Sequence, residues 1–238
     1  MIQLSKRLQA VAKLVTKGNR VADVGCDHGY IAIYLTEESI SPYVVAMDVR
    51  PGPLDRAKKH IERAGLSGKI ETRISDGAEA LKEGEVDTMI CAGMGGRLVI
   101  QIIEAQLSKI RLMKELILQP QSDLHLVRKY LRLKDFITIA EDMVLEDGKY
   151  YPIMKVTPGA IGKSQELDQE IMLSDYFGGL LLLQRHPVLL QYLDWKTQEN
   201  KKIEASLRFG VTLTPKQRER LLEIEAEAER IEIARTYY

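Results

Sequence analysis

Residues 21–30 read Val21-Ala22-Asp23-Val24-Gly25-Cys26-Asp27-His28-Gly29-Tyr30, a short apolar strand that enters a turn with two glycines. Gly25 lets a ligand approach the backbone closely, and the helix that follows Gly29 offers free N–H groups and a positive dipole end. The dinucleotide fingerprint Gly-x-Gly-x-x-Gly is not met, because Asp27 stands at its second glycine. A carboxylate facing a pyrophosphate is unfavourable. These residues therefore indicate either another kind of ligand site or an ordinary strand-to-helix turn.

Strands and helices alternate along the chain around this turn. Apolar runs predict further strands at 43–48, 69–74, 86–91 and 116–118. Helical spacing predicts helices at 4–16, 30–35, 53–64, 98–107 and 123–131. Such repeats indicate a parallel sheet with helices on both faces. Two more strand-like runs flank Asp147-Gly148, a hairpin signal. The predicted fold class is α/β, a Rossmann-like sheet of seven strands that is parallel except for a terminal antiparallel hairpin.

The pattern becomes helical after Thr157-Pro158-Gly159-Ala160, which marks a boundary between two expected domains, 1–160 and 161–238. Pro187 is expected to open a long helix. Thr214-Pro215-Lys216-Gln217 is a capping box with proline at the first helical position. The helix after it carries a narrow apolar seam of Leu221, Ile224, Ala228 and Ile231. We expect these two helices, joined by residues 208–213, to form a small all-α antiparallel hairpin of coiled-coil type.

Acidic residues follow two other strands. Asp48 ends the strand at 43–48, about twenty positions past the glycine turn, where a carboxylate can accept hydrogen bonds from both hydroxyls of a ribose. Asp76-Gly77 follows the strand at 69–74, and its carboxylate can accept from an adenine amino group. A helix cap and a turn are the simpler readings of the two positions. Because ligands bind beyond the carboxyl ends of such strands, the acidic residues together favour a nucleoside-like ligand.

Composition restricts the class of protein. A charged fraction of 29% and a formal net charge of zero suit a globular domain and give no hint of a nucleic-acid partner. The longest apolar runs are too short to cross a bilayer, and no signal peptide is recognisable. Cys26 and Cys91 do not form a metal-binding pattern, so no metal is expected. The short apolar runs likewise predict no membrane partner. A reduced, cytoplasmic protein is the expected setting.

Taken together, these motifs resemble the class I S-adenosylmethionine-dependent methyltransferases. Their signature Asp-x-Gly-x-Gly-x-Gly corresponds to residues 23–29, with Asp27 at the second glycine. A sulfonium cofactor with an amino-acid tail does not suffer the repulsion that a pyrophosphate would. The resemblance implies S-adenosylmethionine as cofactor. It implies cofactor-binding roles for Asp23, Gly25, Cys26, Asp27, His28, Gly29, Asp48, Val49, Asp76, Gly77, Gly93 and Met94.

A closer resemblance covers the whole chain. Ser5-Lys6-Arg7-Leu8, the Asp-His-Gly-Tyr turn, Gly93-Met94-Gly95-Gly96 and the helical hairpin are similar to the bacterial tRNA (adenine-22-N1)-methyltransferases. This implies methylation of N1 of an adenine in the D-arm of tRNA. The loop after the strand at 86–91 lacks the proline and aromatic residues of many enzymes that methylate an exocyclic amine. A ring nitrogen therefore fits better as the acceptor.

Asp27 is the candidate catalytic residue. Methylation of N1 places positive charge on the adenine ring, which a carboxylate stabilises, and the same carboxylate can accept a proton from the N6 amino group. A role in ordering the cofactor is an equal alternative. The candidate RNA contacts are Lys6, Arg7, Lys13 and Arg97, although a solvated face is the simpler interpretation of the basic residues in the first helix.

Three other functions stay open at this point. The chain could methylate a small molecule or a protein instead of tRNA. It could be a dinucleotide-dependent oxidoreductase, which Asp27 and the terminal hairpin disfavour. It could also be an RNA-binding module that retains the fold without catalysis, because fold alone does not establish function. The sequence leaves the oligomeric state and the role of the helical hairpin open, with acidic residues outnumbering basic ones 13 to 11 over residues 161–238.

Overall fold

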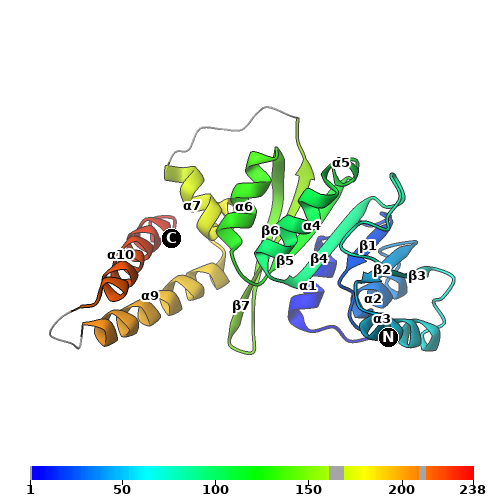
Figure 1. Ribbon diagram of the computed structural model, residues 1–238, viewed down its shortest axis with the longest axis horizontal. Helices are drawn as coiled ribbons and strands as arrows, with labels where there is room; N and C mark the ends of the chain where they lie inside the picture. Colours follow the sequence, from blue (N-terminus) through cyan, green and yellow to red (C-terminus); the bar gives the residue numbers. More distant parts are fainter. Residues whose placement is uncertain (1, 161–168, 209–212) are drawn as a thin grey trace. The chain divides into compact units, whose positions relative to one another are not determined.

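A computed structural model describes residues 2–160, 169–208 and 213–238 (Figure 1). Contacts divide the chain into two compact units, Met1–Glu166 and Leu167–Tyr238, which are described separately. The domain boundary expected between residues 160 and 161 adjoins residues 161–168, which lie outside the described part of the chain. Every helix in the described ranges is too short or too polar to span a lipid bilayer.

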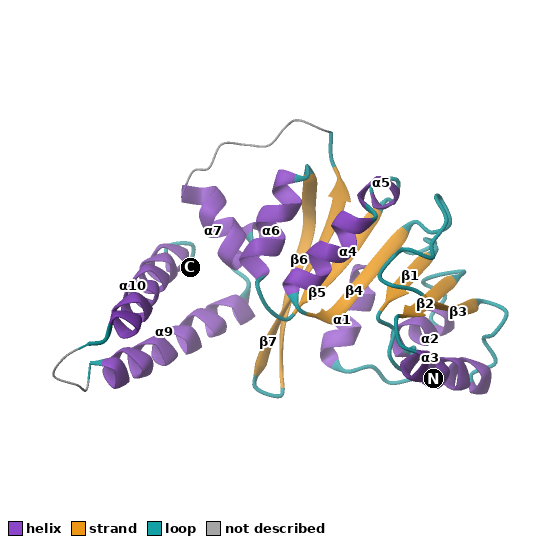
Figure 2. Ribbon diagram, in the orientation of Figure 1, coloured by secondary structure: helices purple, strands orange, loops and turns teal. Residues whose placement is uncertain are grey.

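The first unit contains a sheet of seven strands, as predicted (Figure 2). Its spatial order is β3-β2-β1-β4-β5-β7-β6. Strands β1 to β5 are parallel, whereas β7 runs antiparallel to both β5 and β6. The strands are β1 (Val21–Val24), β2 (Val44–Asp48), β3 (Ile70–Ile74), β4 (Thr88–Met94), β5 (Glu115–Pro120), β6 (Phe136–Glu146) and β7 (Lys149–Pro158). The terminal antiparallel hairpin is therefore confirmed.

Helices cover both faces of the sheet. The central strands β1, β2 and β5 are therefore buried on both sides. One buried cluster joins the sheet to α1 (Lys6–Leu14), α2 (Tyr30–Glu37) and α3 (Pro51–Arg63). A second cluster joins the opposite face to α4 (Gly96–Ala105), α5 (Leu107–Ile110) and α6 (Leu124–Leu133). The carboxyl ends of the parallel strands are thus left as the open edge of a three-layer structure.

The first helix is tied to the last hairpin of the sheet. Ser5 caps α1, and its hydroxyl accepts a hydrogen bond from the Leu8 N–H at 3.4 Å. The carboxylate of Glu146, at the end of β6, accepts from the N–H groups of Lys6 at 2.6 Å and Arg7 at 3.4 Å. An acidic group beside these free N–H groups also complements the positive end of the helix dipole. Arg7 is thereby held near the edge of the sheet.

Strand β4 differs from its predicted span of 86–91. It begins at Thr88 and continues to Met94, with a register shift between Ala92 and Met94. Gly93 lies in this irregularity at φ +80°, a conformation that glycine adopts without strain. Its N–H donates to Oε1 of the buried Gln119 at 3.2 Å. The glycine-rich segment that was expected to be a loop after residue 91 therefore belongs partly to β4, whose last residues form a bulge.

The second unit consists of helices α7 (Gln169–Phe177), α8 (Gly179–Leu183), α9 (Pro187–Leu207) and α10 (Pro215–Arg235). Pro187 opens α9, and Thr214 and Gln217 form the predicted capping box of α10. Helices α9 and α10 pack together. Leu221, Ile224 and Ile231 are buried, whereas Ala228 is exposed, so the predicted seam is correct apart from that residue. Of the expected connection 208–213, residues 209–212 lie outside the described part.

Asn200 is an unusual residue within this helical unit. Its side chain is buried, and neither its amide nitrogen nor its amide oxygen has a hydrogen-bond partner. It borders a cavity of about 210 Å³ between α9 and α10. Burying an unpaired polar group costs about 1–3 kcal/mol. The hairpin therefore carries a local destabilising element.

Asn200→Leu is expected to stabilise the helical unit. The neighbouring cavity has room for the larger side chain, and the unpaired amide is removed. A gain of about 1 kcal/mol would raise the melting temperature by roughly 2–8 °C. Thermal unfolding followed by circular dichroism at the helix band measures this change. An unchanged or lower melting temperature would contradict this prediction.

Candidate active site

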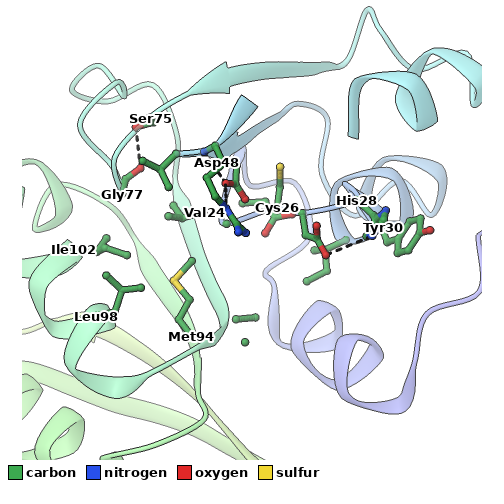
Figure 3. Close-up of a pocket in the computed structure, with 18 of the residues that line it drawn as sticks. Val24, Cys26, His28, Tyr30, Asp48, Ser75, Gly77, Met94, Leu98 and Ile102 are labelled. Carbon is green, nitrogen blue, oxygen red and sulfur yellow. Dashed lines mark hydrogen bonds and ion pairs between the residues drawn. The ribbon is translucent and has the colours of Figure 1, made fainter. Parts of the chain in front are cut away.

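The carboxyl ends of the parallel strands enclose a cavity of about 530 Å³ (Figure 3). This volume lies in the usual range for small-molecule sites, and the position is the expected one for an open α/β sheet. Most of the residues expected to bind a cofactor line it: Asp23, Gly25, Cys26, Asp27, His28, Asp48, Val49, Asp76, Gly77, Gly93 and Met94. Residues from four different strand ends are thus brought to one cavity.

The turn after β1 is folded against the neighbouring strand. The N–H groups of Gly25 and Cys26 both donate to the Met47 carbonyl, at 2.8 and 2.9 Å. Gly25 has φ +75°, and a Cβ atom there would fall on the methyl group of Met94. A residue without a side chain is therefore needed at position 25 to leave room for Met94 beside the turn.

Gly29 has a different role from the other glycine of the turn. It is the N-cap of α2 at φ +72°, and a Cβ atom would lie 3.1 Å from the Ala57 Cβ of α3. Among the described residues, it does not belong to the cavity lining. Gly29 therefore serves the close packing of α2 on α3, and its expected role in cofactor binding stays a prediction.

Asp23 is a buried carboxylate at the base of the cavity. Its side chain is 3% exposed, and Oδ2 has no hydrogen-bond partner. Burial, with a smaller contribution from the charge of Asp48, raises the pKa of Asp23 to about 7. An uncompensated buried carboxylate beside a cavity suits a ligand that carries a positive charge or donates hydrogen bonds.

Asp23→Asn is expected to make the protein more stable at pH 8. Because folding raises this pKa from its ordinary 3.8 to about 7, the folded state binds more protons between these values, and stability falls as pH rises through them. At about 1.4 kcal/mol per pKa unit, the cost above pH 7 reaches about 4 kcal/mol as an upper limit. Asparagine does not ionise and avoids this cost. Melting temperatures from pH 5 to 8 check the prediction: parallel curves for wild type and variant would contradict it.

The ends of β2 and β3 add a second polar wall. Asp48 is 6% exposed, and its Oδ1 accepts from the Arg50 N–H at 2.9 Å. The Ser75 hydroxyl donates to the Gly77 carbonyl at 2.9 Å and shapes the turn after β3. Apolar groups face this wall from α4 and the end of β4. Figure 3 shows Leu98, Ile102 and Met94 together on that side of the cavity. A flat apolar ring with polar edges fits between such surfaces.

Asp27 lies at the edge of the cavity, with φ +46° and a side chain that is 58% exposed. Its Oδ1 accepts from Arg56 Nη2 of α3 at 3.0 Å, and its Oδ2 lies 3.6 Å from His28 Nε2. The carboxylate is therefore oriented by a guanidinium and remains accessible to a molecule that enters the cavity.

The four predicted RNA contacts lie in different places. Arg7 lines the cavity, where its Nη1 donates to Gln119 Oε1 at 2.8 Å and its guanidinium lies over the Tyr151 ring at 5.5 Å. Lys6 and Lys13 are exposed on α1, and Arg97 is exposed on the first turn of α4, 3.6 Å from Asp123. The structure thus brings only Arg7 of these four to the cavity that the described residues line.

Several lining residues were not expected from the sequence. Arg50 follows β2, Gln121 follows β5, and Leu98 and Ile102 lie on α4. Gln119, which holds both Arg7 and Gly93, is completely buried in β5. The sequence did carry a signal for the two glutamines, because polar residues directly follow the apolar run 116–118. Every parallel strand ends at the same edge of the sheet, so these residues are expected near the other strand ends.

Neither cysteine is suited to act as a nucleophile. Cys26 and Cys91 are free and buried, and burial raises the pKa of both thiols above the ordinary value. Both therefore remain protonated at neutral pH and are poor nucleophiles. The described residues hold no group of three or more His, Cys, Asp or Glu side chains placed to bind a metal ion.

A mostly parallel sheet with a terminal antiparallel pair, a glycine turn after β1 and acidic ends of β2 and β3 define a methyltransferase of class I architecture. Comparison with known proteins agrees. A family model described as a methyltransferase domain matches residues 4–154. The tRNA (adenine(22)-N(1))-methyltransferase of Bacillus subtilis is 37% identical over 158 residues, which span 66% of this chain and 66% of that protein.

Two solved structures extend the similarity to nearly the whole chain. Streptococcus pneumoniae Sp1610, in complex with S-adenosyl-L-methionine, is 32% identical with a TM-score of 0.83, over 98% of this chain and 99% of that one. M. capricolum TrmK, in complex with S-adenosyl-homocysteine, is 25% identical with a TM-score of 0.81, over 99% of both chains. The chain belongs to the bacterial tRNA (adenine-22-N1)-methyltransferase family.

Proposed function

We propose that this protein transfers a methyl group from S-adenosylmethionine to N1 of an adenine in the D-arm of tRNA, at position 22. The observation that carries the proposal is that one cavity unites the glycine turn, Asp23 of β1, the acidic ends of β2 and β3, and Arg7. The B. subtilis relative bears the name of this reaction. The protein would act in the cytoplasm, where tRNA is found, and the proposed division is a catalytic domain of residues 1–160 and a helical domain of residues 161–238.

The cavity fits S-adenosylmethionine on the evidence of its own residues. The unpartnered Asp23 carboxylate and the open backbone at Gly25 suit the zwitterionic methionine tail, with Cys26, His28 and Gly93 around them. Asp48 would accept from the ribose hydroxyls. Val49, Asp76, Gly77 and Met94 would hold the adenine ring together with the apolar wall of α4. When bound, the cofactor supplies a methyl group activated by a positive sulfur.

The protein itself would mainly place the acceptor. Methyl transfer to a neutral ring nitrogen needs alignment of the nucleophile, and it creates positive charge on the base. Asp27 stands at the cavity edge with an accessible carboxylate oriented by Arg56, so we assign it the stabilisation of that charge. The same carboxylate can take a proton from the N6 amino group.

Contacts to the RNA backbone would come from basic side chains near the cavity. A base inside a folded tRNA must leave its stack to reach the cavity. Arg7 would hold a phosphate of the extruded nucleotide, because its guanidinium has further N–H groups beyond the one that binds Gln119. Lys6, Lys13 and Arg97 would contact neighbouring phosphates, so binding should weaken as salt rises.

A direct assay tests the proposed function. Unmodified tRNA is incubated with the protein and labelled S-adenosylmethionine, digested, and analysed by nucleoside mass spectrometry. The expected product is 1-methyladenosine. A tRNA in which position 22 carries another base is the matched control and should remain unlabelled. Label in a different nucleoside, or no label despite measured cofactor binding, would contradict the proposal.

A further inference from the structure

Three aromatic rings form a cluster beside the cavity, at the junction of α2 and α3. The rings are those of His28 and Tyr30, which also line the cavity, and of His60, which does not belong to its lining. Their centroids are 5.2, 5.3 and 5.6 Å apart, and their planes lie within 12–19° of one another. Figure 3 shows His28 and Tyr30 next to each other, on the side of the cavity away from Leu98 and Ile102. Three nearly parallel rings at these separations form one packed cluster, called the ring surface below.

The ring surface is not required for packing α2 against α3. That contact is already made by Gly29 and Ala57 and by the buried Ile61. The rings lie outside it, and His28 and Tyr30 each keep 37% of their surface exposed. His60 is fixed to the turn by a 3.0 Å hydrogen bond between its Nδ1 and the His28 carbonyl. The cluster is therefore ordered and partly accessible to solvent.

Cationic side chains accompany His60 on α3. Arg56 lies one turn before His60 on α3, is 49% exposed, and reaches Asp27 at the cavity edge. Lys59 and Arg63, also exposed, are adjacent to His60 in sequence and one turn after it. Aromatic faces interleaved with Lys and Arg are the combination that binds single-stranded nucleic acid, because bases stack on the rings while cations contact phosphates.

We propose that His28, Tyr30 and His60 stack the nucleobase next to the target adenine. This inference rests on the proposed function and names a second nucleotide site for it. Extrusion of the target leaves its neighbour with one unstacked face. A ring surface at the rim of the cavity restores that stacking, whereas the target itself enters the cavity. Arg56, Lys59 and Arg63 are then placed to contact the backbone on this side.

Substitution of His60 tests the site, since this residue lies outside the cavity lining that the described residues form. His60→Leu removes one ring, and His60→Tyr retains an aromatic face as the matched control. The probes are a fluorescent adenosine dodecamer, followed by anisotropy, and a tRNA with 2-aminopurine beside position 22. His60→Leu should weaken dodecamer binding about fivefold or more, the value of one lost base–ring stack. It should also reduce the 2-aminopurine quenching seen with wild type.

The controls separate stacking from charge and from misfolding. His60→Tyr should bind within about twofold of wild type, and calorimetry should show equal cofactor affinity for all three proteins. The slope of affinity against salt should be unchanged in His60→Leu and reduced in Lys59→Gln, which loses a phosphate contact. Wild-type binding and quenching in His60→Leu, with intact tRNA methylation, would overturn the ring site and leave the proposed function standing. Dodecamer binding that depends on His60, without tRNA methylation, would overturn the proposed function alone.

Discussion

Gly25→Ala is expected to bind S-adenosylmethionine about tenfold to a hundredfold more weakly than wild type. The new methyl group would enter the cavity at the point where Met94 covers the turn, and forcing extra atoms into a packed site costs about 1–3 kcal/mol. Met94 is flexible and can move aside, but a ligand that uses the bare backbone of the turn cannot avoid the added atom. Calorimetric titration with the cofactor measures the loss.

The chain offers matched controls for the backbone strain in this variant. Gly25, Gly65 and Gly148 have φ of +75°, +69° and +72°, so alanine is similarly strained at each. A Cβ atom at Gly65 or Gly148 would meet nothing within 4 Å. Gly65→Ala and Gly148→Ala should therefore lose a similar amount of stability and retain cofactor affinity. Equal weakening of cofactor binding in all three would show that strain, and not the space beside Gly25, is responsible.

Asp27→Ala is expected to lower the turnover of tRNA methylation at least tenfold, or about 1.4 kcal/mol of barrier. Its carboxylate is the accessible negative charge assigned to the adenine ring as that ring becomes positive. Cofactor affinity should be largely retained, because Asp23 and Asp48 supply the buried acceptors. Single-turnover kinetics at saturating cofactor and tRNA separate the chemical step from binding.

Asp27→Asn distinguishes the two roles open to this residue. Asparagine keeps the size and a hydrogen-bond acceptor for Arg56 but carries no charge. If Asp27 stabilises the charged ring, this variant should be nearly as slow as Asp27→Ala. If Asp27 only orders the cofactor or its neighbours, turnover should recover towards wild type. Near-normal turnover in both variants would remove Asp27 from the mechanism.

The fold could be predicted from the sequence because its signals are local. The strand at 21–24, the Asp147-Gly148 turn and the capping box at Thr214 each depend on a few adjacent residues, and all three are present. The acidic strand ends converge because parallel strands share one edge. Most of the residues expected to bind the cofactor therefore line one cavity, and their binding roles, like those of Asp27 and the four basic residues, stay predictions.

What escaped prediction depends on contacts between distant segments. Gly29 has the same local pattern as Gly25. However, α3 packs against Gly29, whereas the cavity opens at Gly25. The bulge at Gly93 requires the partner strand β5, and the ring surface requires His60 from a different helix. Neither periodicity nor spacing within one segment carries such information.

The attachment of α1 to Glu146 also has a consequence for synthesis on the ribosome. The helix that carries Arg7 emerges first, yet its partners in β5 and β6 are translated more than a hundred residues later. At about 5–20 residues per second, the nascent helix waits on the order of ten seconds for them. The methyl-transfer cavity is therefore completed late, when the terminal hairpin has left the exit tunnel, and a chain that ends before this hairpin lacks the Glu146 carboxylate that holds the helix of Arg7.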